Sequence, residues 1–233
     1  MKQDDAKRPI RSFGRRRGKP LRSNRADALE INLEKFQITL VDTSHPIDPR
    51  SFFDFNPQKI WFEIGFGNGE YLLHQALNNP DIGMLGCEPY VNGVASLCVE
   101  IKKHNIKNIR IWPDDARLLM PRLIDQSVDK LFLINSDPWP KTRHHKRRFV
   151  QQETLDEIHR LLKPGAEFRM ATDHAGLAGW QLEKTYFHGG FEWTARTAND
   201  WRERPADTPE TRYQEKGKKS GNPTTFLNFI KNQ

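Results

Sequence analysis

Short apolar runs alternate with helical patterns along the chain from about residue 58 onward. Apolar runs that end in Gly, Pro, Asn or Asp are typical of buried strands, and apolar residues that recur every three or four positions are typical of helices. This pattern predicts strands at 59–66, 81–89, 108–115, 128–136, 166–173, 191–198 and 224–232. It predicts helices at 69–79, 90–105, 116–124 and 147–165.

The alternation of strands and helices predicts an α/β fold, with a doubly wound, mostly parallel sheet and helices on both of its faces. We expect three parts: a basic flexible arm at 1–25, a helical or irregular lead-in at 26–57 and a Rossmann-like domain at 58–233. Ligands of such sheets bind beyond the carboxyl ends of the strands. Four acidic residues lie at these predicted ends, namely Glu88, Asp115, Asp137 and Asp173.

Composition narrows the class of protein. Hydrophobic residues make up 36% of the chain, which fits a soluble globular protein. No apolar run approaches the length that spans a bilayer, and the first residues lack the apolar core of a signal peptide. The two cysteines, Cys87 and Cys98, are not in a C-x-x-C pair and give neither a zinc site nor a disulfide framework. We expect a cytoplasmic protein without a membrane or a metal.

The positive charge is concentrated in a few segments. The net charge is +7, and residues 1–25 alone hold ten Lys or Arg against two Asp. Two further basic segments occur at 141–148 and 215–221. A basic tail is typical either of a disordered, solubilising extension or of an arm that binds a polyanion. The three basic segments together favour a polyanion such as a nucleic acid as the partner.

The segment EIGFGNGE at 63–70 follows a predicted strand and opens a predicted helix. Glycines at such a turn let the backbone approach a ligand, and the amino end of the helix offers free N–H groups. A dinucleotide-binding loop would have its third glycine at position 70, but position 70 is Glu and Gly69 comes one residue early. Glu63 would repel a pyrophosphate and attract a cationic amino group or a sulfonium.

The acids at the next two predicted strand ends indicate which other groups the ligand carries. Glu88 is placed to accept hydrogen bonds from both hydroxyls of a ribose, and Asp115 from an adenine amino group, a role for which Asp114 is the alternative. An adenosine with a positive, phosphate-free end is S-adenosylmethionine, which we predict as the cofactor. A tight turn without a ligand is the simpler interpretation of the glycines alone. The acids at three successive strand ends favour the cofactor.

Asp137 stands in SDPWPKTRHHKRR, at 136–148, directly ahead of five Lys or Arg. The neighbouring prolines restrict its backbone, and Trp139 offers a stacking face for an extruded base. The basic residues would hold phosphates without reading sequence. Pairing with Lys141 is the alternative role for Asp137. The two histidines of this segment have no third ligand at a suitable spacing, so we predict no metal.

Three motifs together resemble one known family: the glycine loop EIGFG, the block DPWPKTRHHKRR and the stretch MATD at 170–173. They look like those of the bacterial tRNA (guanine-N7)-methyltransferases, the TrmB family. The resemblance runs from RSFGRRRGK in the arm to TRYQEKG near the end of the chain, and the Asp-Pro-Trp block is its most specific part. It implies the class I S-adenosylmethionine-dependent methyltransferase fold with a basic N-terminal arm.

The resemblance also implies a reaction and roles for individual residues. The reaction is methyl transfer from S-adenosylmethionine to N7 of guanosine 46 in the variable loop of tRNA, with Asp137 as the catalytic residue. For the assembly we expect a monomer or weak homodimer. Cofactor contacts are implied for Glu63, Gly65, Gly67, Gly69, Glu88, Asp115 and Asp137. Substrate contacts are implied for Lys141, Asp173, Thr211, Arg212, Tyr213 and Gln214. RNA contacts are implied for Arg143, His144, His145, Lys146, Arg147 and Arg148.

Two stretches depart from the family pattern. Asn135-Ser136 stands where Phe-Pro is usual. TRYQ at 211–214 stands where Thr-Lys-Phe-Glu is usual. Gln214 therefore lacks the acid of the family motif, and its implied contact with guanine is an open question. The Asp-Pro-aromatic motif also resembles the Asn/Asp-Pro-Pro-Tyr motif of enzymes that methylate exocyclic amino groups in nucleic acid, although the second proline is missing. A non-catalytic RNA-binding protein on the same fold is a further alternative. Binding of the methyl donor would separate it from an enzyme.

Overall fold

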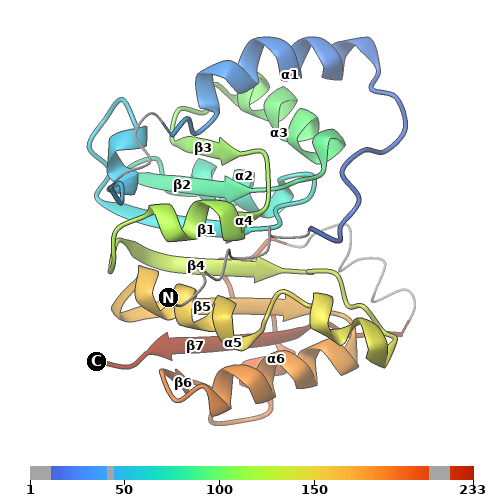
Figure 1. Cartoon of the computed structure of the whole chain (residues 1–233), viewed down its shortest axis with the longest axis vertical. Helices are drawn as coiled ribbons and strands as arrows, with labels where there is room; N and C mark the ends of the chain where they lie inside the picture. Colours follow the sequence, from blue (N-terminus) through green and yellow to red (C-terminus); the bar gives the residue numbers. More distant parts are fainter. Residues whose placement is uncertain (1–11, 41–44, 210–220) are drawn as a thin grey trace, which may run out of the picture.

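The computed structural model describes residues 12–40, 45–209 and 221–233. In these residues seven strands form one sheet in the order β3-β2-β1-β4-β5-β7-β6. The strands are β1 Lys59–Ile64, β2 Ile82–Cys87, β3 Ile109–Trp112, β4 Val128–Ile134, β5 Leu162–Thr172, β6 Phe191–Trp193 and β7 Thr225–Lys231. Strands β1 to β5 run parallel, and β7 pairs antiparallel with β5 and β6 (Figure 1). The predicted doubly wound, mostly parallel sheet is therefore confirmed.

Helices cover both faces of this sheet. The α-helices are α1 Ser23–Phe36, α2 Glu70–Asn78, α3 Val91–His104, α4 Ala116–Leu119, α5 Gln152–Leu161, α6 Ala175–Phe187 and α7 Asn199–Arg202. The 3-10 helices are η1 Pro49–Phe52, η2 Met120–Arg122 and η3 Thr142–Arg147. Figure 1 shows α4 and α5 in front of the sheet and α2 behind it. Ile158 of α5 shares a buried cluster with Phe62, and Leu72 of α2 shares another with Trp61. Trp61 and Phe62 are adjacent in β1, and successive strand residues point to opposite faces of the sheet, so the two side chains belong to different clusters.

The helix predicted at 147–165 exists, but both of its predicted ends are wrong, because α5 spans Gln152–Leu161. α5 begins at Gln152, where the side chain of Gln151 accepts from a backbone N–H of the first turn and the Thr154 hydroxyl accepts from the N–H of Gln151. This capping separates α5 from the basic residues before it, which form η3 instead. β5 follows α5 at once, so Gly165 lies within a strand rather than at a helix end.

Two further predictions differ from the structure near the C-terminus. The strand predicted at 191–198 is short, because β6 holds three residues and the chain then leaves the sheet. The sequence pattern also gave no helix where α6 lies. Apolar residues are spread around α6 rather than gathered in one stripe, and its end leaves Tyr186 and Phe187 exposed. A helix without an apolar stripe has little signal in the sequence.

Part of the predicted arm lies against the domain. α1 begins at Ser23, within that arm, and packs on α3 (Figure 1). Ahead of α1, the carbonyl of Arg16 accepts from the N–H of Val91 at 3.0 Å. The side chain of Asn92 accepts from the N–H of Gly18 at 2.8 Å. These bonds fix the described part of the arm next to the start of α3, at the carboxyl edge of the sheet.

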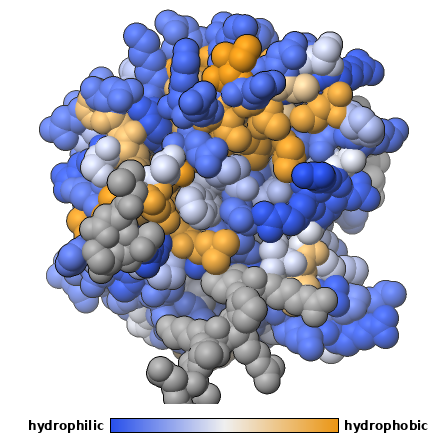
Figure 2. Space-filling view, turned by 45° about the horizontal axis from the view of Figure 1, so that its top comes forward, coloured by the Kyte–Doolittle hydropathy of each residue, from blue (hydrophilic) through white to orange (hydrophobic). Residues whose placement is uncertain are grey.

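The surface is mostly polar. No helix of the described ranges is long and apolar enough to cross a bilayer. Figure 2, in which the top of Figure 1 is turned forward, shows a hydrophilic surface with apolar residues gathered in the upper half of the view. A shallow hollow beside α1 is lined in part by Leu21, Leu29 and Leu33.

Candidate active site

A pocket of about 770 Å³ opens at the carboxyl edge of the sheet, around the neighbouring strands β1 and β4. The strand order reverses at this point, and ligands of doubly wound sheets bind there. The wall of the pocket brings together Glu63, just before the glycine loop, and the four acids at predicted strand ends: Glu88, Asp115, Asp137 and Asp173. The predicted position of the site is thus the position of the pocket.

The glycine loop between β1 and α2 forms one side of the pocket. Its backbone is left-handed at three positions, with φ of 73° at Gly65, 57° at Gly67 and 82° at Gly69. L side chains rarely adopt this conformation, so the turn requires glycine. A side chain at Gly65 or Gly67 would meet no described atom within 4 Å. The backbone of the loop is therefore open to close approach by a ligand.

Glu63 is a buried carboxyl in the wall of this pocket. The residue is 2% exposed, and its Oε2 has no hydrogen-bond partner among the described residues. Burial raises the pKa of Glu63 to about 8, and the negative charge of Glu88 adds to the shift. A buried, unpartnered carboxyl is unfavourable unless it is protonated or meets a cation. A cationic group of a ligand would supply the missing partner.

We expect Glu63 to make the ligand-free protein less stable as the pH rises from about 4.5 to 8. In this window the unfolded chain has lost the Glu63 proton while the folded protein still holds it, so the unfolded state binds fewer protons and a higher pH favours unfolding. The contribution is on the order of 3–5 kcal/mol. The free energy of unfolding, measured with urea at several pH values, should therefore change less with pH in Glu63→Gln than in the wild type.

Glu192→Gln is the matched control, because Glu192 lies exposed on β6 at the far edge of the sheet. Its stability should follow the wild type across the same pH range. Parallel curves for the wild type and Glu63→Gln would show that Glu63 is ionised in the folded protein and would contradict this account.

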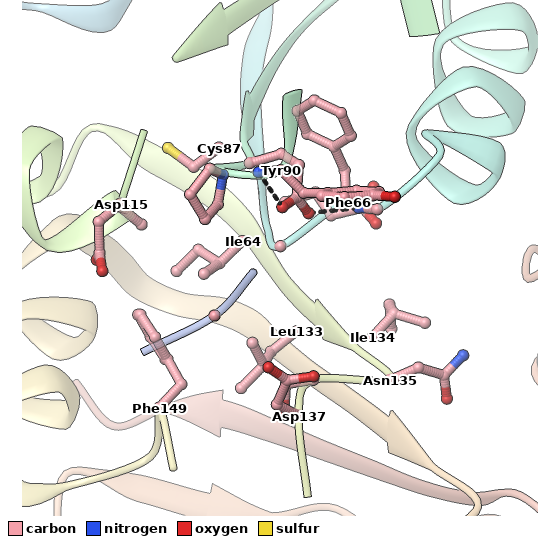
Figure 3. Close-up of a pocket in the computed structure, with 18 of the residues that line it drawn as sticks. Ile64, Phe66, Cys87, Tyr90, Asp115, Leu133, Ile134, Asn135, Asp137 and Phe149 are labelled. Atoms are coloured by element: carbon pink, nitrogen blue, oxygen red, sulfur yellow. Dashed lines mark hydrogen bonds between the residues drawn. The ribbon is translucent and has the colours of Figure 1, made fainter. Parts of the chain in front are cut away.

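Glu88 is held by the backbone of two loops. Its Oε2 accepts from the N–H of Gly67 at 2.7 Å and its Oε1 from the N–H of Tyr90 at 2.8 Å (dashed lines in Figure 3). Burial raises the pKa of Glu88 against the opposing effect of these two bonds, and the charge of Asp137 adds to the rise. A carboxylate has about four acceptor sites. Glu88 can therefore still accept from the hydroxyls of a ligand.

The two aspartates after β3 have different surroundings. Asp115 lines the pocket and accepts from the backbone N–H of Arg117 at 3.0 Å and from its guanidinium at 2.7 Å. Burial alone would raise the pKa of Asp115, but the bonds and charge of Arg117 outweigh burial and hold it below its ordinary value. Asp114 does not line the pocket and pairs with Arg16 at 2.9 Å. This placement favours Asp115 as the acid that meets a ligand.

Asp137 lies in a strained turn after β4. Asn135 and Trp139, on either side of it, have positive φ values of 53° and 41°. Asn adopts this conformation readily, but for the bulky Trp139 it costs about 1–3 kcal/mol, and such residues gather at functional sites where other contacts enforce them. Figure 3 shows Asp137 beside the pocket and the amide of Asn135 turned away from it. The exposed Lys141 forms no ion pair with Asp137 in the structure, so the alternative in which the two neutralise each other gains no support.

The basic segment at 141–148 divides into exposed and packed residues. Its exposed bases are Lys141, Arg143 and Lys146. The ring of His144 meets Trp139 edge to face at 5.9 Å between centroids, and that of His145 meets Trp180 at 5.4 Å. Desolvation and the surrounding positive charges lower the pKa of His144. The lowered pKa disfavours an additional positive charge on this histidine.

The last two arginines of the segment have different environments. Arg147 lines the pocket, with its guanidinium 4.9 Å from the ring centroid of Trp139. Arg148 is 4% exposed, and its guanidinium donates to the carbonyls of Pro138 and Gly176. These contacts do not favour the predicted role of Arg148 as an RNA contact, because a guanidinium enclosed in this way is turned away from a phosphate on the surface.

The predicted substrate contacts fall into three groups. Asp173 lines the pocket at the end of β5. Lys141 is exposed outside the pocket wall. The others lie outside the described residues, namely Thr211, Arg212, Tyr213 and Gln214. In the parts of the chain that the structure describes, no group of three or more His, Cys, Asp or Glu could hold a metal ion.

Sequence reasoning missed the N-terminal side of the pocket. Its lining includes Ser12, Phe13, Gly14 and Arg15. A hydrogen bond from Ser12 contributes to the lowered pKa of Asp115, and a side chain at Gly14 would lie 3.9 Å from Oδ2 of Asp137. The charge of this segment obscured its packing. The Phe and Gly within RSFGRRRGK are the signal that could have indicated it.

The chain is similar to proteins of a known class. A family model described as "putative methyltransferase" matches residues 57–227. A tRNA (guanine-N(7)-)-methyltransferase of Agrobacterium fabrum is 43% identical over 219 residues, which are 94% of this chain and 94% of that protein. A protein of the same name from Jannaschia sp. is 44% identical over 230 residues, which are 96% of each chain.

Solved structures share the fold. The 16S rRNA (adenine(1408)-N(1))-methyltransferase from Catenulisporales acidiphilia superimposes with a TM-score of 0.54 at 13% identity, over 85% of this chain and 97% of that chain. A structure described as an antibiotic related methyltransferase gives a TM-score of 0.53 at 15% identity, over 83% of this chain and 98% of that chain. At such identities the likeness concerns the fold alone.

Proposed function

Because the chain belongs to the tRNA (guanine-N(7)-)-methyltransferase family, we propose that its pocket transfers a methyl group from S-adenosylmethionine to N7 of a guanosine in tRNA, giving 7-methylguanosine. The observation that carries the proposal is the convergence of Glu63, Glu88 and Asp137 on one pocket beside a left-handed glycine loop. The first two acids fit the cofactor, and the third fits the purine.

The residues of the pocket fit S-adenosylmethionine. The unpartnered Oε2 of Glu63 can meet its cationic amino-acid end. The remaining acceptor sites of Glu88 suit the ribose hydroxyls, and Asp115 suits the adenine amino group. The open backbone of the glycine loop allows the close approach that such a ligand needs. When bound, S-adenosylmethionine supplies a methyl group on a positively charged sulfur.

Asp137 acts through its charge rather than as a base. Guanine N7 carries a lone pair and no proton, so this methylation needs no proton transfer. As N7 bonds to the methyl carbon, the carbon–sulfur bond breaks with its electron pair left on sulfur, and positive charge moves onto the purine. The carboxylate of Asp137 stabilises this charge and accepts hydrogen bonds from N1–H and the 2-amino group. Its contribution is positioning and electrostatic stabilisation.

The exposed bases of the segment 141–148 hold the phosphates of tRNA. Backbone contacts of this kind fix register and orientation without reading sequence. Asp173, on the pocket wall, and the residues at 211–214 contact the guanosine in this proposal. By family resemblance the target is guanosine 46 in the variable loop.

We propose a monomer or weak homodimer in the cytoplasm. Sedimentation of the purified protein at several concentrations measures the assembly directly.

Glu88→Ala should weaken binding of S-adenosylmethionine and S-adenosylhomocysteine alike, by roughly 1.5–3 kcal/mol, the usual value of hydrogen bonds to a charged group. Both ligands carry the same ribose, so calorimetry should give the same loss for each. NAD should not bind the wild type, because Glu63 lies where a pyrophosphate would be held. Glu100→Ala, on the part-exposed side of α3, is the control and should leave both affinities unchanged. Tight NAD binding, or a Glu88→Ala protein with wild-type affinity, would refute the cofactor assignment.

Product analysis tests the function against its two alternatives. Nucleoside mass spectrometry of tRNA treated with the protein and S-adenosylmethionine should show 7-methylguanosine. A methyl group on an exocyclic amino nitrogen would place the chain with the enzymes that carry an Asn/Asp-Pro-Pro-Tyr motif. Absence of S-adenosylmethionine binding in calorimetry would identify a non-catalytic RNA-binding protein.

A further inference from the structure

We propose that Arg148 is a positioning residue for methyl transfer, which holds the turn of Asp137 in place from inside the fold instead of binding RNA. The proposal deepens the proposed function of the pocket and rests on it. Arg148 is the last base of the segment 141–148, and its sequence gives no hint that it differs from the others. In the structure it is 4% exposed, whereas Arg143 is exposed.

The guanidinium of Arg148 joins the loop after β4, which carries Asp137, to the first turn of α6, which follows Asp173. Its Nε donates to the carbonyl of Pro138 at 2.9 Å, directly after Asp137. Its Nη1 donates to the carbonyl of Gly176 at 3.2 Å, three residues after Asp173. A planar guanidinium presents its N–H groups in a fixed fork, so it can bond two carbonyls at once and fix the distance between them.

The packing of Arg148 holds the guanidinium itself in place. Its Cζ lies 5.2 Å from the ring centroid of Trp180, and the indole N–H of Trp180 donates to the carbonyl of Val150 at 2.8 Å. Within the described ranges no carboxylate forms an ion pair with Arg148. Carbonyls and an aromatic face therefore compensate for taking this charge out of water. A residue that merely filled this space could be apolar, so the retained charge points to a geometric role.

The turn needs such support because its backbone is strained. Trp139 has a φ of 41°, which is unfavourable for a bulky residue and persists only where neighbouring contacts enforce it. Arg148 fixes the carbonyl just before Trp139 from the inside, and Arg147 stacks on the Trp139 ring from the pocket side. Loss of the bond from Arg148 to the carbonyl of Pro138 would let the turn relax, and Asp137 would then move with it. A misplacement of about 1 Å at a reacting centre costs on the order of 100-fold in rate.

Arg148→Lys tests the proposal, because it keeps the charge but lacks the fork that bonds both carbonyls. We expect kcat for 7-methylguanosine formation to fall about 10- to 100-fold. The KM for tRNA, the salt dependence of tRNA binding and the affinity for S-adenosylmethionine should stay near those of the wild type. Arg148→Gln can donate to one carbonyl, and its kcat should fall as well.

Arg110→Lys is the matched control. Arg110 is also buried, donates to the carbonyls of Phe52 and Lys107 and stacks on Phe53 at 4.9 Å, but it does not line the pocket. Its replacement should lower the melting temperature without lowering kcat. All variants are assayed at a temperature at which each binds one S-adenosylmethionine per chain.

A second readout is independent of activity. Hydrogen exchange of the backbone amides in 135–141, followed by mass spectrometry, should be faster in Arg148→Lys than in the wild type and unchanged in Arg110→Lys. If the wild-type protein forms no 7-methylguanosine, the proposed function fails, and the exchange rates still decide whether Arg148 holds the turn.

Three results would overturn the proposal. The first is unchanged kcat and unchanged exchange in both Arg148 variants. The second is a higher KM for tRNA with a weaker salt dependence, as expected for Arg143→Ala, because Arg148 would then be a phosphate contact. The third is a loss of kcat in Arg148→Lys and Arg110→Lys alike that follows their melting temperatures, which would make Arg148 a general stabilising residue.

Discussion

We expect Asp137→Asn to lower kcat for tRNA methylation by about 10²–10³-fold, the usual effect of removing one preorganised electrostatic contact. The substitution keeps the size of the side chain and removes its charge, so it isolates the stabilisation of the positive purine. Single-turnover rates with saturating tRNA and S-adenosylmethionine measure the chemical step. Binding of tRNA should survive, since the exposed bases at 141–148 are intact.

The same substitution at Asp156 is the matched control. Asp156 lies on α5 and pairs with His188, and neither residue lines the pocket. Asp156→Asn should methylate tRNA at the wild-type rate. Full activity of Asp137→Asn would remove the electrostatic mechanism, whatever the product of the reaction.

Salt should weaken tRNA binding by about 10³–10⁵-fold between 50 and 200 mM if the protein neutralises six to ten phosphates. Release of counterions from the RNA drives this dependence, at about 0.7–0.9 log units of affinity per log unit of salt for each phosphate contact. The double variant Arg143→Ala/Lys146→Ala removes two exposed bases near the pocket. Its slope should be lower by about two, as measured by fluorescence anisotropy of labelled tRNA.

Lys102→Ala/Lys103→Ala changes the net charge by the same amount at a different place. These lysines are exposed in the last turn of α3, at the opposite end of that helix from the pocket. The slope should stay at the wild-type value in this control. Equal changes in both double variants would mean that binding follows net charge and not a defined surface.

The sheet could be predicted from the sequence because each parallel strand is a short apolar run between turn residues. The boundaries that failed have specific causes. The capping by Gln151 and Thr154 starts α5 later than its apolar pattern suggests. α6 has no apolar stripe, since it packs at the edge of the sheet and leaves Tyr186 and Phe187 exposed. The capping is a local interaction of polar side chains and the exposure of α6 is a matter of tertiary packing, and a periodic apolar pattern encodes neither.

The acids of the site were predictable for a geometric reason. Parallel strands end at one edge, so Glu88, Asp115 and Asp137 had to come together there. The burial of Arg148 could not be predicted, because a buried arginine and an exposed one look the same within a basic segment. The contribution of Ser12 to the pocket depends on how the arm folds back, which charge and composition do not show.

The central claim is that this pocket methylates guanine N7, and the position of the methyl group in the product tests it most directly. A tRNA transcript treated with the protein and S-adenosylmethionine should yield 7-methylguanosine in nucleoside mass spectrometry. Because that base carries a fixed positive charge, borohydride reduction followed by aniline should cut the tRNA at one site, in the variable loop. A methyl group on an exocyclic nitrogen with the tRNA chain left uncut would contradict the account.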